Sequence, residues 1–217
     1  MNKKLLIVTA FLAIATQTFA QTWGIKAGAN FSDMVCKDDN TTYSDNYGQA
    51  LGYHVGLTLN VPVKQMFSFE TAFLFSTKGY EEHISYSSLS TKYDQTVTIY
   101  YLDIPLTGKA SFDVGPVTLY GVLGPYLGVG LLGKYTTETT VLGVSTSSDG
   151  ELAWGTEDEN SLNRLDYGVT AGAGVEFNSV QVGFNYYYGV ANASSYTTNG
   201  YTANHRVCEI SLGYRFK

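Results

Sequence analysis

The side chains best suited to chemistry in this sequence are its histidines and the carboxylates near them. His54 has Asp103 or Glu70 as a candidate partner, a combination that imitates part of a His–Asp catalytic site. No oriented nucleophile accompanies these residues, and no G-x-S-x-G, H-E-x-x-H or P-loop motif is present. We therefore expect His54 to be hydrogen-bonded within a polar interior. We expect no catalytic activity, no metal site and no cofactor.

A further set of charged residues recurs at alternating positions of several segments. Because a strand has a period of two, this spacing places the set on one face of each strand, together with His54 and Lys78. The set contains both signs of charge, so its members can form ion pairs if that face is enclosed. We predict a lumen charge network formed by Lys26, Glu70, Asp103, Lys109, Asp166, Glu176, Glu209 and Arg215.

Eight segments of alternating polarity must position these side chains. Most of them have 10–14 residues, slightly more than the roughly 9–11 residues with which a tilted strand crosses a bilayer. They lie near residues 23–32, 50–61, 66–78, 97–110, 117–131, 165–177, 180–190 and 206–216.

The connections between these segments alternate in length. Short ones at 62–65, 111–116 and 178–179 take turns with long ones at 33–49, 79–96, 132–164 and 191–205. Tight turns at one end and longer loops at the other are typical of outer-membrane barrels. The acidic stretch 156–160 lies in the third long connection, and we expect a solvated loop there because its spacing matches no calcium loop.

The other face of the segments is apolar, bulky and free of charge. A lipocalin-like barrel would have to pack this face into a lumen of eight strands, whereas a membrane barrel exposes it to lipid. We predict an all-β, eight-stranded antiparallel up-and-down transmembrane β-barrel. A soluble periplasmic lipocalin-like binding barrel is the alternative.

The first residues have the features of an export signal. Lys3 and Lys4 precede an apolar run at 5–15, and small Ala20 suits cleavage before Gln21. We expect residues 1–20 to be a cleaved signal peptide and residues 21–217 to be a barrel domain in the cell outer membrane, in contact with its lipid. The mature chain keeps 11 Lys and Arg residues against 19 Asp and Glu residues, a balance that argues against nucleic acid as a partner.

Several stretches resemble a known family. "YYLDIPLTGKA" (100–110) is similar to the fourth-strand signature of the PorT-like outer-membrane β-barrels of Bacteroidetes, and "WGIKAGANFS" (23–32) is similar to their first strand. The stretches 119–131, 166–177 and 210–217 match the fifth, sixth and last strands. The resemblance implies an eight-stranded outer-membrane barrel. It does not imply the role of the name-giving member, an accessory of a type IX secretion system.

Two cysteines remain to be placed. Cys36 follows the first segment and Cys208 begins the last one, and these two segments are neighbours in a closed barrel. The compartment permits oxidation, so the pair forms either a disulfide or two free thiols, with Cys208 then facing lipid.

These observations favour a small barrel of structural or interaction type, which presents four outer loops to a protein, a glycan or another envelope component. The alternatives are a narrow channel or small-ligand carrier, and an accessory to a type IX secretion system. Because an eight-stranded barrel is just wide enough for its own side chains, a pore is the less favoured reading.

Overall fold

The computed structural model describes residues 21–44, 47–86, 91–155 and 162–216. The predicted signal peptide and the acidic stretch 156–160 lie outside the described residues. The elements are β1 (Thr22–Lys37), β2 (Tyr47–Gly48), β3 (Ala50–Lys64), β4 (Phe67–Tyr86), β5 (Thr91–Val114), β6 (Val117–Val141), β7 (Val144–Glu151), β8 (Leu165–Phe177), β9 (Val180–Gly189), the short 3-10 helix η3 (Thr198–Gly200) and β10 (Thr202–Arg215).

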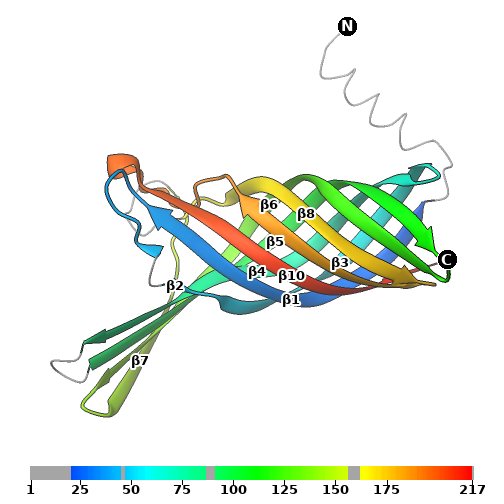
Figure 1. Ribbon diagram of the computed structural model, residues 1–217. Helices are drawn as coiled ribbons and strands as arrows, with labels where there is room; N and C mark the ends of the chain where they lie inside the picture. Colours follow the sequence, from blue (N-terminus) through cyan, green and yellow to red (C-terminus); the bar gives the residue numbers. More distant parts are fainter. Residues whose placement is uncertain (1–20, 45–46, 87–90, 156–161, 217) are drawn as a thin grey trace, which may run out of the picture.

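Eight of the described strands form a closed antiparallel ring, as Figure 1 shows. Each long strand pairs with its neighbour in the sequence, in the order β1–β3–β4–β5–β6–β8–β9–β10, and β10 pairs back with β1. The predicted eight-stranded up-and-down barrel is therefore confirmed. Among the described residues, no helix is long and apolar enough to span a membrane.

Three tight turns lie together at one end of the barrel, here called the turn end. They occupy residues 65–66, 115–116 and 178–179, between β3 and β4, β5 and β6, and β8 and β9. Two of them use left-handed backbone, at Gly115 (φ 62°) and Asn178 (φ 56°), which glycine and asparagine tolerate best. The longer connections lie at the opposite end, here called the loop end.

The pleat of the strands separates apolar from charged side chains. Leu123 and Leu212 are more than 60% exposed on the outside of the barrel, while Lys109 and Asp166 are at least 98% buried inside it. Exposed aromatic rings gather toward the two ends of this apolar band, at Trp23, Phe67, Phe112, Phe177 and Phe216 near the turn end, and at Tyr53, Tyr167 and Tyr188 nearer the loop end. The lipocalin-like alternative is therefore wrong, because its apolar face would point inward.

Two of the predicted loops are instead strands. Strands β4, β5 and β6 continue past the barrel and, with β7, form a projecting sheet, the outer extension (79–86, 91–99, 133–141 and 144–151), visible at the lower left of Figure 1. The long connections predicted at 79–96 and 132–164 therefore consist largely of paired strands in their described parts. These segments are rich in Thr, Ser and charged residues on both faces, so they lack the apolar alternation from which strands are predicted.

We expect a histidine on the outer extension, His83, to make the stability of the extension depend on pH. His83 Nδ1 lies 2.6 Å from Asp94 Oδ1 on β5, and Nε2 lies 3.5 Å from Glu81 Oε2. The hydrogen bond to Asp94 raises the pKa of His83, and the charges of both carboxylates add to this effect.

Because the folded-state pKa is raised, the stabilising contribution of His83 is complete below its unfolded-state pKa. It is lost as the pH rises through the raised value. We expect amide hydrogen exchange in the β4–β5 part of the outer extension to accelerate slightly over this interval, after correction for intrinsic exchange. His83→Ala should remove that dependence. An unchanged dependence in this variant would mean that another group is responsible.

Candidate functional site

The lumen is filled by the charged side chains that the sequence pattern placed there. All eight residues of the predicted charge network point inward, and most are almost fully buried. They do not form one continuous network. They divide into separate clusters along the barrel axis, and the most buried cluster is centred on Lys78, which was placed on this face but not included in the predicted network.

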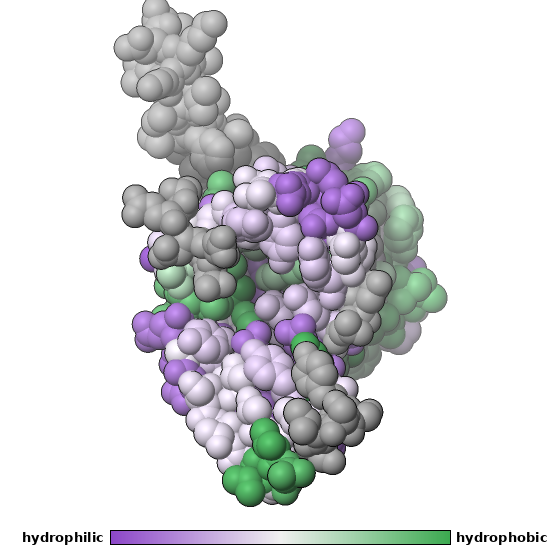
Figure 2. Space-filling view, turned by 90° about the vertical axis from the view of Figure 1, so that its left-hand side faces the viewer, coloured by the Kyte–Doolittle hydropathy of each residue, from purple (hydrophilic) through white to green (hydrophobic). Residues whose placement is uncertain are grey.

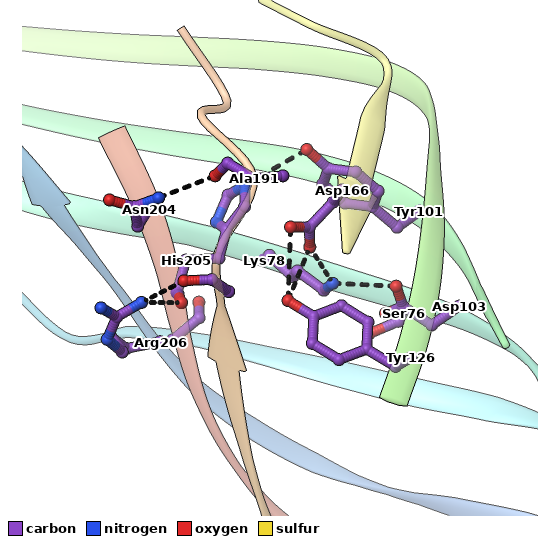
Figure 3. A network of polar contacts seen from close by, with 12 residues as sticks. Ser76, Lys78, Tyr101, Asp103, Tyr126, Asp166, Ala191, Asn204, His205 and Arg206 are labelled. Carbon is purple, nitrogen blue, oxygen red and sulfur yellow. Dashed lines mark hydrogen bonds and ion pairs between the residues drawn. The ribbon is translucent and has the colours of Figure 1, made fainter. Parts of the chain in front are cut away.

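Lys78 lies between a carboxylate of the neighbouring strand β5 and a carboxylate of β8, which reaches it across the lumen. Its Nζ is 2.8 Å from Asp103 Oδ1 on β5 and 2.8 Å from Asp166 Oδ2 on β8, as Figure 3 shows. Tyr126 donates a hydrogen bond to Asp166 (3.1 Å), and the rings of Tyr101 and Tyr126 face the ammonium at 4.6 and 4.9 Å. Two carboxylates thus face one ammonium, and the side chains bridge the lumen from β4 to β8.

A second cluster lies nearer the turn end. Lys109 Nζ is 2.8 Å from Glu70 Oε2 and 2.6 Å from Glu176 Oε1, and it lies over the ring of Tyr120. Arg215 also pairs with Glu176. This cluster joins β4, β5, β8 and β10, so it too crosses the lumen.

The remaining predicted residues form a third cluster around His54. Lys26 Nζ lies 3.6 Å from Glu209 Oε2. His54 Nδ1 donates to Asn30 Oδ1 (2.6 Å), and its Nε2 lies 3.0 Å from Ser211 Oγ. Within the described residues, His54 forms no bond with Asp103 or Glu70, so the candidate His–Asp arrangement is not assembled.

An apolar layer separates these clusters from the loop end. It consists of buried Met34, Val97, Ile99, Ala193 and Ala203, next to Tyr101 and Cys36. Apolar side chains offer water and ions no hydrogen-bonding partners. The lumen is therefore filled by charged clusters and covered by an apolar layer on the loop side.

A pocket opens above this layer at the loop end. Its volume is about 1070 Å³, and Figure 2, which views the loop end, shows the hollow with hydrophobic residues inside it. The walls come from the end of β1, one face of the outer extension, Tyr47 and the segments around residues 38–43 and 194–203. We call this the mouth pocket. Its most frequent lining residue is tyrosine, at positions 43, 47, 80, 135, 196 and 201.

Burial affects the phenol groups of Tyr47 and Tyr80 and the thiol of Cys36 in the mouth pocket. Burial raises the pKa of Tyr80 to about 12, and burial raises that of Tyr47 further. Burial also raises the pKa of the Cys36 thiol, which contacts the hydroxyls of Tyr201 and Tyr47. These groups therefore offer hydrogen-bond donors and neutral ring faces, not charges.

Of the two alternatives for the cysteines, the structure has two free thiols. Cys36 and Cys208 are both free. In the β1–β10 register Cys36 is opposite Ala203, while Cys208 is opposite Phe31. Cys36 points into the barrel and Cys208 points outward, because the two positions fall on opposite faces of the pleated sheet. The prediction that the first and last strands are neighbours is confirmed. The two cysteines are nevertheless neither opposite each other nor on the same face, so they cannot form a disulfide.

Sequence reasoning did not predict the mouth pocket. Its tyrosines come from predicted loops and are far apart in the sequence, so no motif connects them. The available signal was the tyrosine content of these loops, which is unusual for segments that are merely solvated.

A closed antiparallel ring with an apolar outer band, aromatic residues at both edges and a charged interior defines an integral outer-membrane β-barrel. The family model described as "Outer membrane protein beta-barrel domain" matches residues 19–195, and the chain belongs to this family. The loop end is accordingly the outer end, and the turn end faces the periplasm.

Solved structures with this architecture have low sequence identity to the chain. Ail of Yersinia pestis is 17% identical, with 90% of this chain and 98% of that chain covered and a TM-score of 0.36. Neisserial surface protein A is 17% identical (90% and 96% covered, TM-score 0.38), and outer membrane protein W of E. coli is 16% identical (92% and 100% covered, TM-score 0.35). Curated protein sequences give no match. The family assignment therefore depends on the family model and the strand topology.

Proposed function

We propose that this outer-membrane barrel is a closed scaffold that binds a partner at its outer end and neither conducts nor catalyses. The observation that carries the proposal is the filling of the lumen by buried ion pairs, of which Lys78–Asp166 reaches from β4 to β8, beneath an apolar layer. A barrel built in this way holds its outer end rigidly in the membrane. Binding at the outer end then uses the outer extension and the mouth pocket, which both lie at that end of the barrel.

The closed lumen leads to a direct prediction for conductance. We expect the purified, folded protein to show no steady unitary conductance steps in planar bilayers, because ions would have to cross both the charged clusters and the apolar layer. A porin reconstituted in the same bilayers is the positive control. Regular conductance steps from the wild-type protein would contradict the proposal and favour the narrow channel.

The mouth pocket favours small-ligand binding as a second candidate function. Its volume, about 1070 Å³, lies just above the roughly 300–1,000 Å³ range of typical ligand sites. This candidate is compatible with a closed lumen, since a ligand bound at the outer end need not pass through the barrel.

The resemblance to PorT-like barrels supports a further candidate, an accessory role in type IX secretion. A protein or glycan at the outer end is the partner this role would require. Deletion of the gene followed by measurement of secreted cargo tests it, and unchanged secretion would remove this candidate without affecting the closed-scaffold proposal.

A further inference from the structure

The mouth pocket has a strongly biased chemistry. The apolar layer formed by Met34, Val97 and Ile99 makes its floor, and tyrosines make much of its walls. None of the described residues that line it is Lys, Arg or His. Its charged lining residues are all acidic, namely Asp38, Glu82 and Glu151. An anionic ligand would therefore find no compensating charge in the pocket.

Glu82 is the carboxylate best placed to meet a ligand. It lies on β4 on the same face as Tyr80, which lines the pocket, and Lys78, which points into the lumen. It is also close enough to Tyr47, Tyr80 and Cys36 to affect the pKa of each. Within the part of the chain that the structure describes, no basic residue forms an ion pair with Glu82. This differs from the lumen, where every buried cation is paired with carboxylates.

The tyrosines of the mouth pocket form two groups, and one of these groups lies close to Glu82. Tyr47 and Tyr80 stack with ring centroids 4.4 Å apart. Tyr201 lies between Tyr43 and Tyr196, at 6.0 and 5.9 Å, with interplanar angles of 53° and 59°. Tilted rings of this kind form a corner and do not cover one another's faces. The negative face of an aromatic ring attracts cations, and several such rings together recognise ammonium groups.

We propose that the mouth pocket binds a small organic cation with an apolar body, whose ammonium group lies near Glu82 and whose body packs against the tyrosines and the apolar floor. The three features that support this are an unpaired carboxylate, neutral aromatic walls and the lack of basic lining residues. The inference rests on the proposed function and names the ligand class of the same outer site. It does not require any passage through the lumen.

The test uses two ligands of nearly equal shape that differ in charge. Choline and its neutral carbon isostere, 3,3-dimethylbutan-1-ol, are titrated by calorimetry into the full-length folded protein in detergent, and benzyltrimethylammonium tests the contribution of an apolar body. We expect both cations to bind, benzyltrimethylammonium more tightly, and the neutral isostere to bind at least about tenfold more weakly than choline, as cation–π contacts and one carboxylate together predict.

A matched pair of variants assigns the effect to the pocket. Glu82→Gln should weaken binding of the cations about fivefold to tenfold. Glu81→Gln removes the same charge from the adjacent position of β4, on the opposite face of the sheet, where Glu81 lies 3.5 Å from His83. This control should leave the affinity unchanged. Heat-modifiable gel mobility shows whether each variant is folded.

Equal binding of choline and its isostere, equal effects of the two variants, or no binding of either cation would each overturn the inference. Binding of methyl glucoside in place of the cations would overturn it too, and would indicate a sugar site. The conductance measurement is independent of these outcomes. A conducting barrel that binds cations contradicts only the closed-scaffold proposal, and a non-conducting barrel that does not bind them contradicts only the ligand inference.

Discussion

Replacing Lys78 with methionine is expected to destabilise the barrel by about 3–5 kcal/mol, the range observed when one partner of a buried ion pair is removed. Asp103 and Asp166 are each about 1% exposed, and both lie 2.8 Å from the ammonium. Without it, two carboxylates of like charge remain facing each other in an enclosed space. The measurement is urea unfolding of the refolded protein in lipid, followed by heat-modifiable gel mobility.

Two comparisons distinguish this explanation from a general sensitivity of the barrel's stability to any substitution in the lumen. Lys26→Met removes a more exposed cation that lies 3.6 Å from Glu209, and we expect a much smaller loss. Adding Asp103→Asn and Asp166→Asn to Lys78→Met should restore a large part of the lost stability, because no uncompensated charge then remains. A loss with Lys78→Met no larger than with Lys26→Met would refute the assigned role of the central cluster.

Gly28→Ala is expected to prevent normal folding or to destabilise the barrel by more than about 3 kcal/mol, the upper end of typical overpacking costs. A Cβ atom at this position would lie 1.9 Å from the carbonyl oxygen of Ile210 on β10 and 2.7 Å from the His54 ring. The first contact is with backbone of the neighbouring strand, so a change of rotamer cannot relieve it. The yield of heat-modifiable barrel after refolding measures the effect.

Gly121→Ala is the matched control. Gly121 is also a strand glycine, but the nearest atom to its added Cβ is the carbonyl oxygen of Gly172 at 3.8 Å, an ordinary contact. We expect this variant to refold like the wild type. Equal losses for the two variants would show that glycine content as such, and not close approach at Gly28, controls folding.

The fold could be predicted because its two physical signals are local. Alternation at positions such as Val169, Ala171 and Ala173 identifies a strand and its lipid face, and tight turns such as Asn178-Ser179 identify where a strand reverses. The outer extension lacks the alternation of apolar and polar residues. Its strands are held by backbone pairing, such as Tyr93 opposite Thr139, with polar side chains on both faces.

The candidate site was only partly predictable, because its geometry depends on register. The inward face of Asp103 and Asp166 follows from alternation, but their meeting on Lys78 depends on how far β4, β5 and β8 are staggered around the ring. The register of β1 against β10 likewise determines that Cys36 and Cys208 are not opposite each other. The tyrosines of the mouth pocket come together from separate loops, which only the folded chain reveals.

The pairing of β1 with β10 has a consequence for the order of assembly. It joins residues 24–37 to residues 202–215 in one continuous ladder, whereas most other strand pairs of the ring are adjacent in the sequence. A chain from which β10 has not yet emerged therefore leaves two unpaired edges, on β1 and β9, and each can pair with another molecule. The ring cannot close during synthesis, and its most sequence-distant contact forms last. Until β10 joins β1, both edges therefore remain open to pairing with other chains.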